Sequence, residues 1–309
     1  MIYQNKHKFK SFLLLAALML VAAIKGYAQT PAFTYTQYMD NLTPLNPAYS
    51  LLDKAASVSS LARKEWVGID GAPTTFLLNA NIPFSDINAA TGIIIFNDNF
   101  AVEHQTEVNA YFAKAIQLGQ TDFLAVSMNA GIRNYTAYYS QLDSNDPEFR
   151  NDIRQDKPNI GFGVMYYTDT YYIGISAPEL TITSLGTASV QNNNNFVNHY
   201  YIAGAFITGA PDDDIKLKPA FLVSYAKGTT TTADVSAIVI LKDILGIGFD
   251  YRTSNQAAGI ITLNVDSFHI GYSYQFNTAS NDLGGFNIPT HEVTISYRFG
   301  AGAANPKLL

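Results

Sequence analysis

In HEVTISYRF, residues 291–299, every second residue is apolar and the residues between them are polar or charged. Successive side chains of a β-strand point to opposite faces of a sheet, so this period predicts a strand with one apolar and one hydrated face. Repeated strands of this kind restrict the chain to an all-β fold, either a soluble sandwich with apolar faces inside or a barrel with an apolar exterior and a hydrated interior. The period recurs in FHIGYSYQF (268–276), NIGFGVMYY (159–167), DFLAVSMNAGIR (122–133) and TTFLLNANI (74–82).

The lengths of the connections favour the barrel. Counted along the chain from the first predicted strand, the even-numbered connections between strands are short, and several of the odd-numbered ones are long. The long ones are residues 136–157, 178–198 and 277–289. Short turns at one end, long loops at the other and an even strand number are typical of bacterial outer-membrane barrels. We therefore predict a transmembrane antiparallel β-barrel over residues 55–299, with periplasmic termini. About 14 strands are expected, near residues 55–65, 73–83, 90–97, 101–117, 121–135, 158–168, 171–177, 199–209, 215–226, 233–241, 244–252, 256–263, 266–276 and 290–299.

Composition agrees with a membrane barrel and excludes other classes. The chain is 48% hydrophobic and only 14% charged, against about 25% charged residues in soluble domains. After the N-terminal region, no run approaches the roughly 20 apolar residues that a membrane-spanning helix needs. The 25 acidic residues outnumber the 19 basic ones, and four of the lysines precede residue 28. This acidic balance argues against nucleic acid as a partner.

The N-terminus has the pattern of a secretory signal peptide. Three lysines before residue 11 precede an apolar stretch at residues 12–24, and small residues follow at Gly26 and Ala28. We expect cleavage after Ala28 and export to the outer membrane. The alternative, an N-terminal membrane anchor, is disfavoured because 13 apolar residues do not span a bilayer. The chain has no cysteine, so neither a lipidated N-terminal cysteine nor a disulfide can form.

The histidines do not form a recognisable catalytic or metal site. Without a serine and an orienting acid at suitable spacing, none is a convincing general base, and each is expected to lie in the lumen or at the membrane interface. His291-Glu292 does not complete the zinc motif HExxH, because Ile295 occupies the place of the second histidine. We expect no catalysis, no cofactor and no bound metal. The four histidines of the mature chain are His104, His199, His269 and His291.

The acidic and amide-rich stretches have ordinary structural interpretations. Residues 212–214 are three aspartates that lack the alternating ligands of a calcium loop and indicate a solvated turn. The QNNNN tract at residues 191–195 indicates a flexible loop. Glu103, Gln105, Glu107 and Asn109 would share one face of a strand, opposite Val102, Val108, Ala110 and Phe112. Carboxylates must face water, so we expect that face in the lumen, as a selectivity feature or as a partner surface.

The segment RKEWVGIDGAPTT, residues 63–75, contains the only tryptophan of the chain. The strand order places it in the first outward loop, where Trp66 would lie at the membrane interface or cap the lumen. Gly68 and Gly71 permit the positive φ angles of a tight reversal. Pro73 would open the next strand at a position that donates no ladder hydrogen bond.

The combination R-x-x-W-x-G-x-x-G-A-P-x-T resembles a signature of the PorP/SprF family of type IX secretion membrane proteins. The segment PAFTYTQYMDNLTPLNPAYS (31–50) resembles the mature N-terminus of that family, and the closing THEVTISYRF (290–299) is similar to its C-terminal strand. The resemblance runs in order through nearly the whole mature chain. It implies that the following residues form the family motif or bind partners: Asn46, Pro47, Ala48, Arg63, Trp66, Gly68, Gly71, Ala72, Pro73, Thr75, His291 and Glu292.

This resemblance implies a non-enzymatic outer-membrane barrel of the Bacteroidetes type IX machinery. Such a barrel assists export or surface attachment of large secreted proteins, gliding adhesins among them. Its partners would be membrane lipid, secreted cargo or adhesins, and other type IX components, including periplasmic ones. The alternative is a porin or ligand transporter for small solutes. We divide the chain into a signal peptide (1–28), a periplasmic or lumen-lining segment (29–54), the barrel (55–299) and a tail (300–309).

Overall fold

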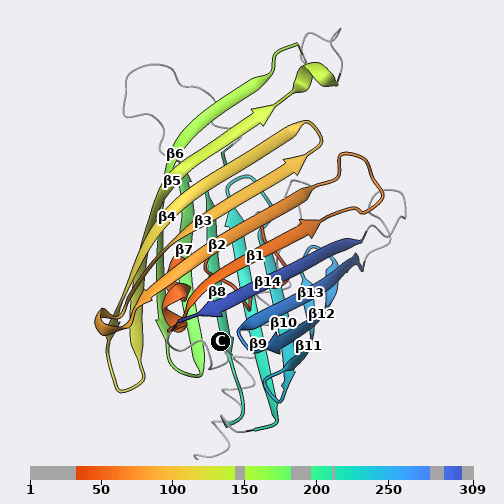
Figure 1. Cartoon of the computed structure of the whole chain (residues 1–309). Helices are drawn as coiled ribbons and strands as arrows, with labels where there is room; N and C mark the ends of the chain where they lie inside the picture. Colours follow the sequence, from red (N-terminus) through yellow and green to blue (C-terminus); the bar gives the residue numbers. More distant parts are fainter. Residues whose placement is uncertain (1–32, 143–149, 182–195, 211–212, 279–288, 301–309) are drawn as a thin grey trace, which may run out of the picture.

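A computed structural model describes residues 33–142, 150–181, 196–210, 213–278 and 289–300. Its strands form one closed antiparallel barrel in which each strand pairs with its neighbours in sequence and β14 pairs with β1 (Figure 1). Among the described residues, no helix is long and apolar enough to cross a membrane. The strands are β1 (Ala56–Lys64), β2 (Thr74–Phe84), β3 (Ala89–Phe100), β4 (Glu103–Gln117), β5 (Phe123–Ala137), β6 (Ile153–Tyr167), β7 (Tyr171–Thr181), β8 (His199–Phe206), β9 (Ile215–Ala226), β10 (Thr232–Leu241), β11 (Leu245–Arg252), β12 (Gln256–Val265), β13 (Phe268–Asn277) and β14 (Thr290–Phe299).

The strand count and strand order predicted from sequence are confirmed. β1 begins and β14 ends at the same end of the barrel, which we call the inner end; the opposite end is the outer end. The connections after β5, β7 and β13, residues 138–152, 182–198 and 278–289, join strand ends at the outer end. All three are longer than the longest inner connection, residues 207–214. This is the arrangement of outer-membrane barrels, with short periplasmic turns.

The largest difference between a predicted and an observed strand boundary is at the start of β6. β6 begins at Ile153, five residues earlier than the predicted start at residue 158. The added residues, Ile153–Lys157, pair with the outer end of β5, and neither Arg154 nor Asp156 on the exterior face is apolar. Beyond the apolar band both faces of a strand are polar, so the alternation that identifies a strand is missing there.

The exterior of the barrel is apolar, which excludes the sandwich. Along β14, Val293, Ile295 and Tyr297 on the exterior are each more than 40% exposed, whereas Glu292 and Thr294 on the other face are less than 8% exposed. A soluble sandwich would bury the first group and expose the second. The face of β4 that carries Glu107 likewise turns inward, as predicted.

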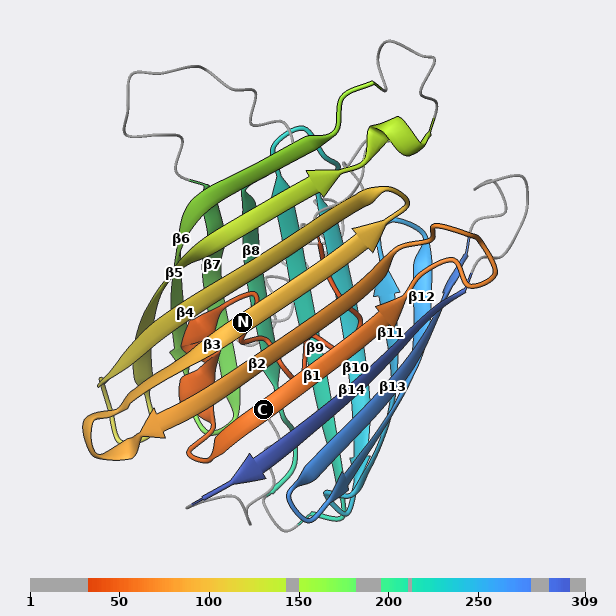
Figure 2. The same cartoon turned by 45° about the horizontal axis from the view of Figure 1, so that its top comes forward.

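The interior of the barrel is packed with side chains of the wall and of the segment that precedes β1. Residues 33–55, here called the plug, run inside the barrel and include the 3₁₀-helix η1 (Pro47–Leu52) (Figure 2). Two further 3₁₀-helices, η2 (Ser85–Ile87) and η3 (Tyr139–Gln141), lie in turns outside the lumen. Plug and wall share one buried apolar cluster, which includes Tyr35, Tyr38, Met39, Leu42 and Tyr49 of the plug and Leu61, Leu77, Met165, Leu222 and Ile238 of the strands.

Candidate functional site

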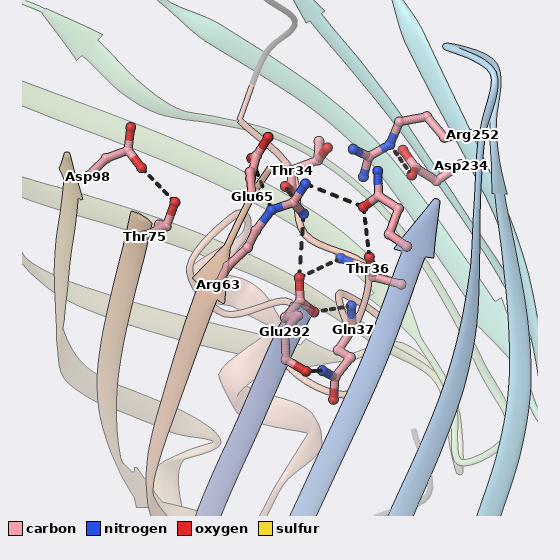
Figure 3. Close-up of polar contacts among 11 residues, drawn as sticks. Thr34, Thr36, Gln37, Arg63, Glu65, Thr75, Asp98, Asp234, Arg252 and Glu292 are labelled. Carbon is pink, nitrogen blue, oxygen red and sulfur yellow. Dashed lines mark hydrogen bonds and ion pairs between the residues drawn. The ribbon is translucent and has the colours of Figure 1, made fainter. Parts of the chain in front are cut away.

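The carboxylate of Glu292 on β14 holds the backbone of the plug (Figure 3). Its two oxygens accept hydrogen bonds from the amide nitrogens of Thr36, at 3.1 Å, and Gln37, at 2.8 Å. The Gln37 side chain donates a further bond to the Glu292 carbonyl oxygen at 3.3 Å. Glu292 is only 1% exposed. A buried carboxylate that accepts two amide hydrogens forms charge-assisted bonds, which are about twice as strong as neutral ones.

Arg63 on β1 completes this contact. Its Nη1 donates to the carbonyl oxygen of Thr34 at 3.1 Å and to Glu292 at 3.4 Å. Its Nη2 donates to Gln275 of β13 at 3.3 Å, and its Nε to Glu65 at 3.1 Å. We call Arg63, Gln275 and Glu292 the plug anchor. These bonds pair a guanidinium that is almost fully buried, at a position where an unpaired charge would be costly.

The plug anchor lies at the closing seam of the barrel. Arg63 and Glu292 are direct partners in the register of β1 and β14, the pair of strands that closes the cylinder. The residues come from opposite ends of the barrel sequence and meet only when this pair forms. The same two residues therefore join the first strand, the last strand and the plug.

A glycine of the wall admits the plug side chain next to the anchor. The Gln37 oxygen Oε1 accepts a hydrogen bond from Thr294 at 2.6 Å. An added Cβ at Gly271 of β13 would lie 1.9 Å from this oxygen. Only glycine at this strand position allows so close an approach.

The Asn-Pro-Ala element forms the second contact between plug and wall. The Asn46 oxygen Oδ1 accepts from the Ala48 amide at 3.1 Å and caps η1, while Pro47 occupies the first turn, where no amide hydrogen is needed. Ala48 is fully buried.

The side-chain nitrogen Nδ2 of Asn46 faces the wall. It donates to the carbonyl oxygens of Val164 on β6 and Ile175 on β7, both at 3.3 Å. A Cβ at Gly163 would lie 2.2 Å from Oδ1 of Asn46, and one at Gly174 would lie 2.9 Å from its Nδ2. The two glycines thus form the recess that receives this side chain.

The loop between β1 and β2, residues 65–73, lies at the outer end. Gly68 and Gly71 have φ angles of 100° and 74°, which confirms the expected role of the glycines. Trp66 also has a positive φ, 47°, which its sequence does not reveal. Its indole packs edge-on against Phe100 at a ring distance of 5.8 Å, and Gly71 accepts a bond from Ala101 at 2.8 Å. These contacts fix the loop to the turn between β3 and β4.

The remaining motif residues flank this loop. Ala72 is buried, and the Pro73 carbonyl oxygen accepts from the Glu65 amide at 3.0 Å, which closes the hairpin. Thr75 on β2 donates to Asp98 on β3 at 2.5 Å (Figure 3). His291 faces away from the lumen, and its Nδ1 lies 2.8 Å from the Tyr272 hydroxyl.

Comparison with protein families decides the family of the chain. The sequence profile described as "Type IX secretion system membrane protein PorP/SprF" matches residues 27–297, which is most of the chain. The chain belongs to the PorP/SprF family. A search of curated proteins found no match.

Solved structures similar to this family member are outer-membrane barrels of low sequence identity. Omp33 of Acinetobacter baumannii is 8% identical, with a TM-score of 0.47 over 80% of this chain and 99% of that chain. The monoaromatic hydrocarbon channel CymD is 11% identical, with a TM-score of 0.49 over 88% and 95%. The toluene transporter TodX of Pseudomonas putida is 9% identical, with a TM-score of 0.47 over 89% and 98%. At these identities the likeness concerns the fold alone.

The PorP/SprF motif residues lie in separate parts of the structure. Arg63 and Glu292 meet in the plug anchor, whereas Asn46 binds β6 and β7 and Pro47 and Ala48 lie in the first turn of η1. The loop residues 66–73 lie at the outer end, and His291 lies on the exterior. Sequence reasoning missed Gln275, Gly163, Gly174 and Gly271. The three glycines carried a signal, because an isolated glycine inside a strand pattern indicates a close approach of another chain segment.

Further charged groups in the lumen are also paired. Arg133 contacts Glu107 at 2.5 Å and Glu179 at 3.2 Å, and His199 contacts Glu179 at 2.9 Å. Near the inner end, two ion pairs tie the plug to the wall: Asp40 with Lys218 and Asp53 with Arg298.

The other residues singled out in the sequence have structural environments. His104 bonds to Asn99, and His269 bonds to Asn264. Asp213 accepts from the Ala210 amide and closes an exposed turn; Asp212 and the QNNNN tract lie outside the described residues. Within the described part of the chain, no group of three or more histidine, aspartate or glutamate residues could hold a metal ion.

Proposed function

We propose that this PorP/SprF protein is a non-enzymatic outer-membrane component of the type IX machinery that assists export or surface attachment of large secreted proteins. It does so through contacts of its outer loops with cargo or with other components. The observation that carries the proposal is a lumen occupied by the plug, with anchoring groups that are buried and bonded. A barrel closed in this way is suited to present a surface and not to pass a solute.

The loop of residues 65–73 is the proposed contact surface. Val67 and Ile69 are 44% and 45% exposed at its tip, next to Trp66. A protein interface needs apolar and aromatic side chains that are accessible but held in place. The bond between Gly71 and Ala101 and the packing of Trp66 on Phe100 provide that support.

The test removes the apolar tip and leaves the plug anchor intact. Val67→Ser with Ile69→Ser should reduce the amount of secreted protein retained on the cell surface, while heat-modifiable barrel remains abundant in the membrane. The matched control is Leu118→Ser with Ile244→Ser, two exposed apolar residues of inner turns, which should leave surface retention unchanged. Normal retention in the loop variant, with the barrel folded, would contradict the proposal.

The porin alternative requires a path through the lumen. Purified protein in a planar bilayer should show no steady conductance, because the plug fills the barrel. Steady conductance of the unmodified protein would favour the porin alternative over the proposed closed barrel.

A further inference from the structure

A recess lies between the plug and the wall at the inner end of the barrel, and we call it the inner recess. Its empty volume is about 750 Å³, counting the part that is open to solvent, which is within the range of small-molecule pockets. It reaches the inner mouth, because exposed Asp266 in the turn between β12 and β13 lines it. Outward of Ser59 and Asn79, the next lumen-facing residues are Leu61 and Leu77 of the buried apolar cluster. The recess is therefore bounded toward the outer end and is not a path through the lumen.

The wall of the inner recess is one row of polar side chains on four neighbouring strands. Ser59 on β1 is the register partner of Asn79 on β2 and of Ser296 on β14, and Ser296 is the partner of His269 on β13. All four residues line the recess. The two serines are small, so this part of the lumen is left open. The plug forms the opposite side of the recess with Asp40, Asn41, Thr43, Ser50 and Asp53.

The charged groups of the recess pair with one another. Asp40 lies 3.4 Å from Nζ of Lys218, and Asp53 lies 2.7 Å from Nη2 of Arg298. The remaining carboxylate, Asp266, is exposed at the mouth. A charged ligand would have to compete with these ion pairs for its counter-charge. The recess is therefore suited to a neutral ligand.

The other polar groups of the recess are neutral donors and acceptors. Asn41 Nδ2 donates to Asn79 Oδ1 at 2.7 Å, which leaves Asn41 Oδ1 as an acceptor and Asn79 Nδ2 as a donor. A hydroxyl group can both donate and accept. A ligand that carries several hydroxyl groups of its own would match this mixed set. The lining hydroxyls without a hydrogen-bond partner among the described residues are those of Thr43, Ser57, Ser59 and Ser296.

We propose that the inner recess binds a neutral saccharide unit from the periplasmic side. The ligand's hydroxyl groups bond to the serines of β1 and β14 and to the asparagines of the plug and β2. The source of the saccharide is either the glycan of the cell wall or a soluble sugar, which present the same hydroxyl chemistry. This site lies at the opposite end of the barrel from the loop of residues 65–73 and is independent of the contacts proposed for that loop.

Binding to the purified full-length protein tests the recess. The detergent must have no sugar head group, and the probes are the disaccharides chitobiose and maltose, measured by equilibrium dialysis. Ser59→Ala with Ser296→Ala should weaken binding about tenfold, because two hydrogen bonds to the ligand are lost. The matched control is Ser60→Ala with Ser254→Ala, because Ser60 lies on the exterior face next to Ser59 and Ser254 lies in an outer turn; it should bind like the unmodified protein.

Two results would overturn the proposal, provided that heat-modifiability shows a folded barrel. One is that the unmodified protein binds neither disaccharide. The other is that the Ser59 and Ser296 variant binds as tightly as the unmodified protein.

Isolated cell walls distinguish the two sources of the saccharide. Retention of the unmodified protein on cell walls, with release by chitobiose, would support the site and identify the glycan as the source. Binding of a disaccharide without retention on cell walls would support the site and identify a soluble sugar.

Discussion

Replacing Glu292 with glutamine should loosen the plug. The Glu292 carboxylate accepts two amide hydrogens of the plug and contacts Arg63. Glutamine has nearly the same shape but only one oxygen, so one of these two amides would face an NH₂ group and lose its acceptor. Arg63 would lose a buried counter-ion and keep only Glu65, which is 27% exposed.

The size of the effect follows from these contacts. A hydrogen bond to a charged group contributes about 1.5–3 kcal/mol, and a buried ion pair broken at one partner costs about 3–5 kcal/mol. Both losses arise at the same carboxylate, and Arg63 keeps Glu65 as a counter-ion. We therefore expect a free-energy cost at the lower end of the ion-pair range, about 3 kcal/mol. At about 1.4 kcal/mol per factor of ten, the undocked fraction of the plug should rise roughly a hundredfold.

The assay is the frequency of channel openings in a planar bilayer. Unmodified protein should be silent, whereas Glu292→Gln should open intermittently and should unfold at a lower temperature in the heat-modifiability assay. Glu65→Gln is the matched control, because it removes the same charge from Arg63 but touches none of the plug residues in Figure 3. A Glu292→Gln variant as silent and as heat-stable as the unmodified protein would refute the anchoring role, as would equal opening of both variants.

Three further predictions concern the wall and the strand order. Gly271→Ala should lower the midpoint temperature of heat modification, because the new methyl group would overlap Gln37 Oε1. Adding Gln37→Ala to this variant should restore part of the loss. An unchanged midpoint in Gly271→Ala would mean that the Gln37 side chain does not pack against Gly271. Asn46→Ala should cost about 1–3 kcal/mol through the lost helix cap and two lost bonds to the wall. This is more than the cost of Asn41→Ala, which loses one side-chain hydrogen bond, to Asn79. Denaturant titration in detergent compares the two, and an equal or smaller loss in Asn46→Ala would contradict the role of Asn46 in holding the plug. Ser254→Cys, in the turn between β11 and β12, should react with an impermeant maleimide on intact cells, whereas Ser85→Cys, in the turn between β2 and β3, should not; the reverse pattern would invert the orientation.

The strands of the barrel wall could be predicted from the sequence because lipid and lumen favour opposite kinds of side chain at alternate residues. Segments such as 268–276 and 290–299 show that alternation without interruption, and their predicted bounds differ from β13 and β14 by at most two residues. The alternation ends where β6 rises beyond the apolar band, and there the prediction started five residues late. The alternation of apolar and polar residues indicates the environment of each face of a strand, but it does not indicate where the strand ends.

The plug could not be recognised in the same way. Residues 33–55 have no regular period, because a segment that packs against a wall on all sides buries Thr34 and Gln37 as completely as Leu42. Arg63 and Glu292 stood out only as motif residues, and their pairing follows from a register between strands that are more than 200 residues apart. Trp66 stood out as the only tryptophan, but its left-handed backbone is set by the loop contacts and not by its own preference.

The position of the anchor on the β1–β14 seam links closure of the barrel to docking of the plug. A barrel is completed when its first and last strands join. In this protein that step also brings together Arg63 and Glu292, which bind the carbonyl oxygen of Thr34 and the amide hydrogens of Thr36 and Gln37. A molecule whose leading segment was damaged or missing would have to close with Arg63 and Glu292 deprived of those bonds. Closure itself would then discriminate intact from defective molecules, and the assembly machinery would need no separate receptor for the leading segment.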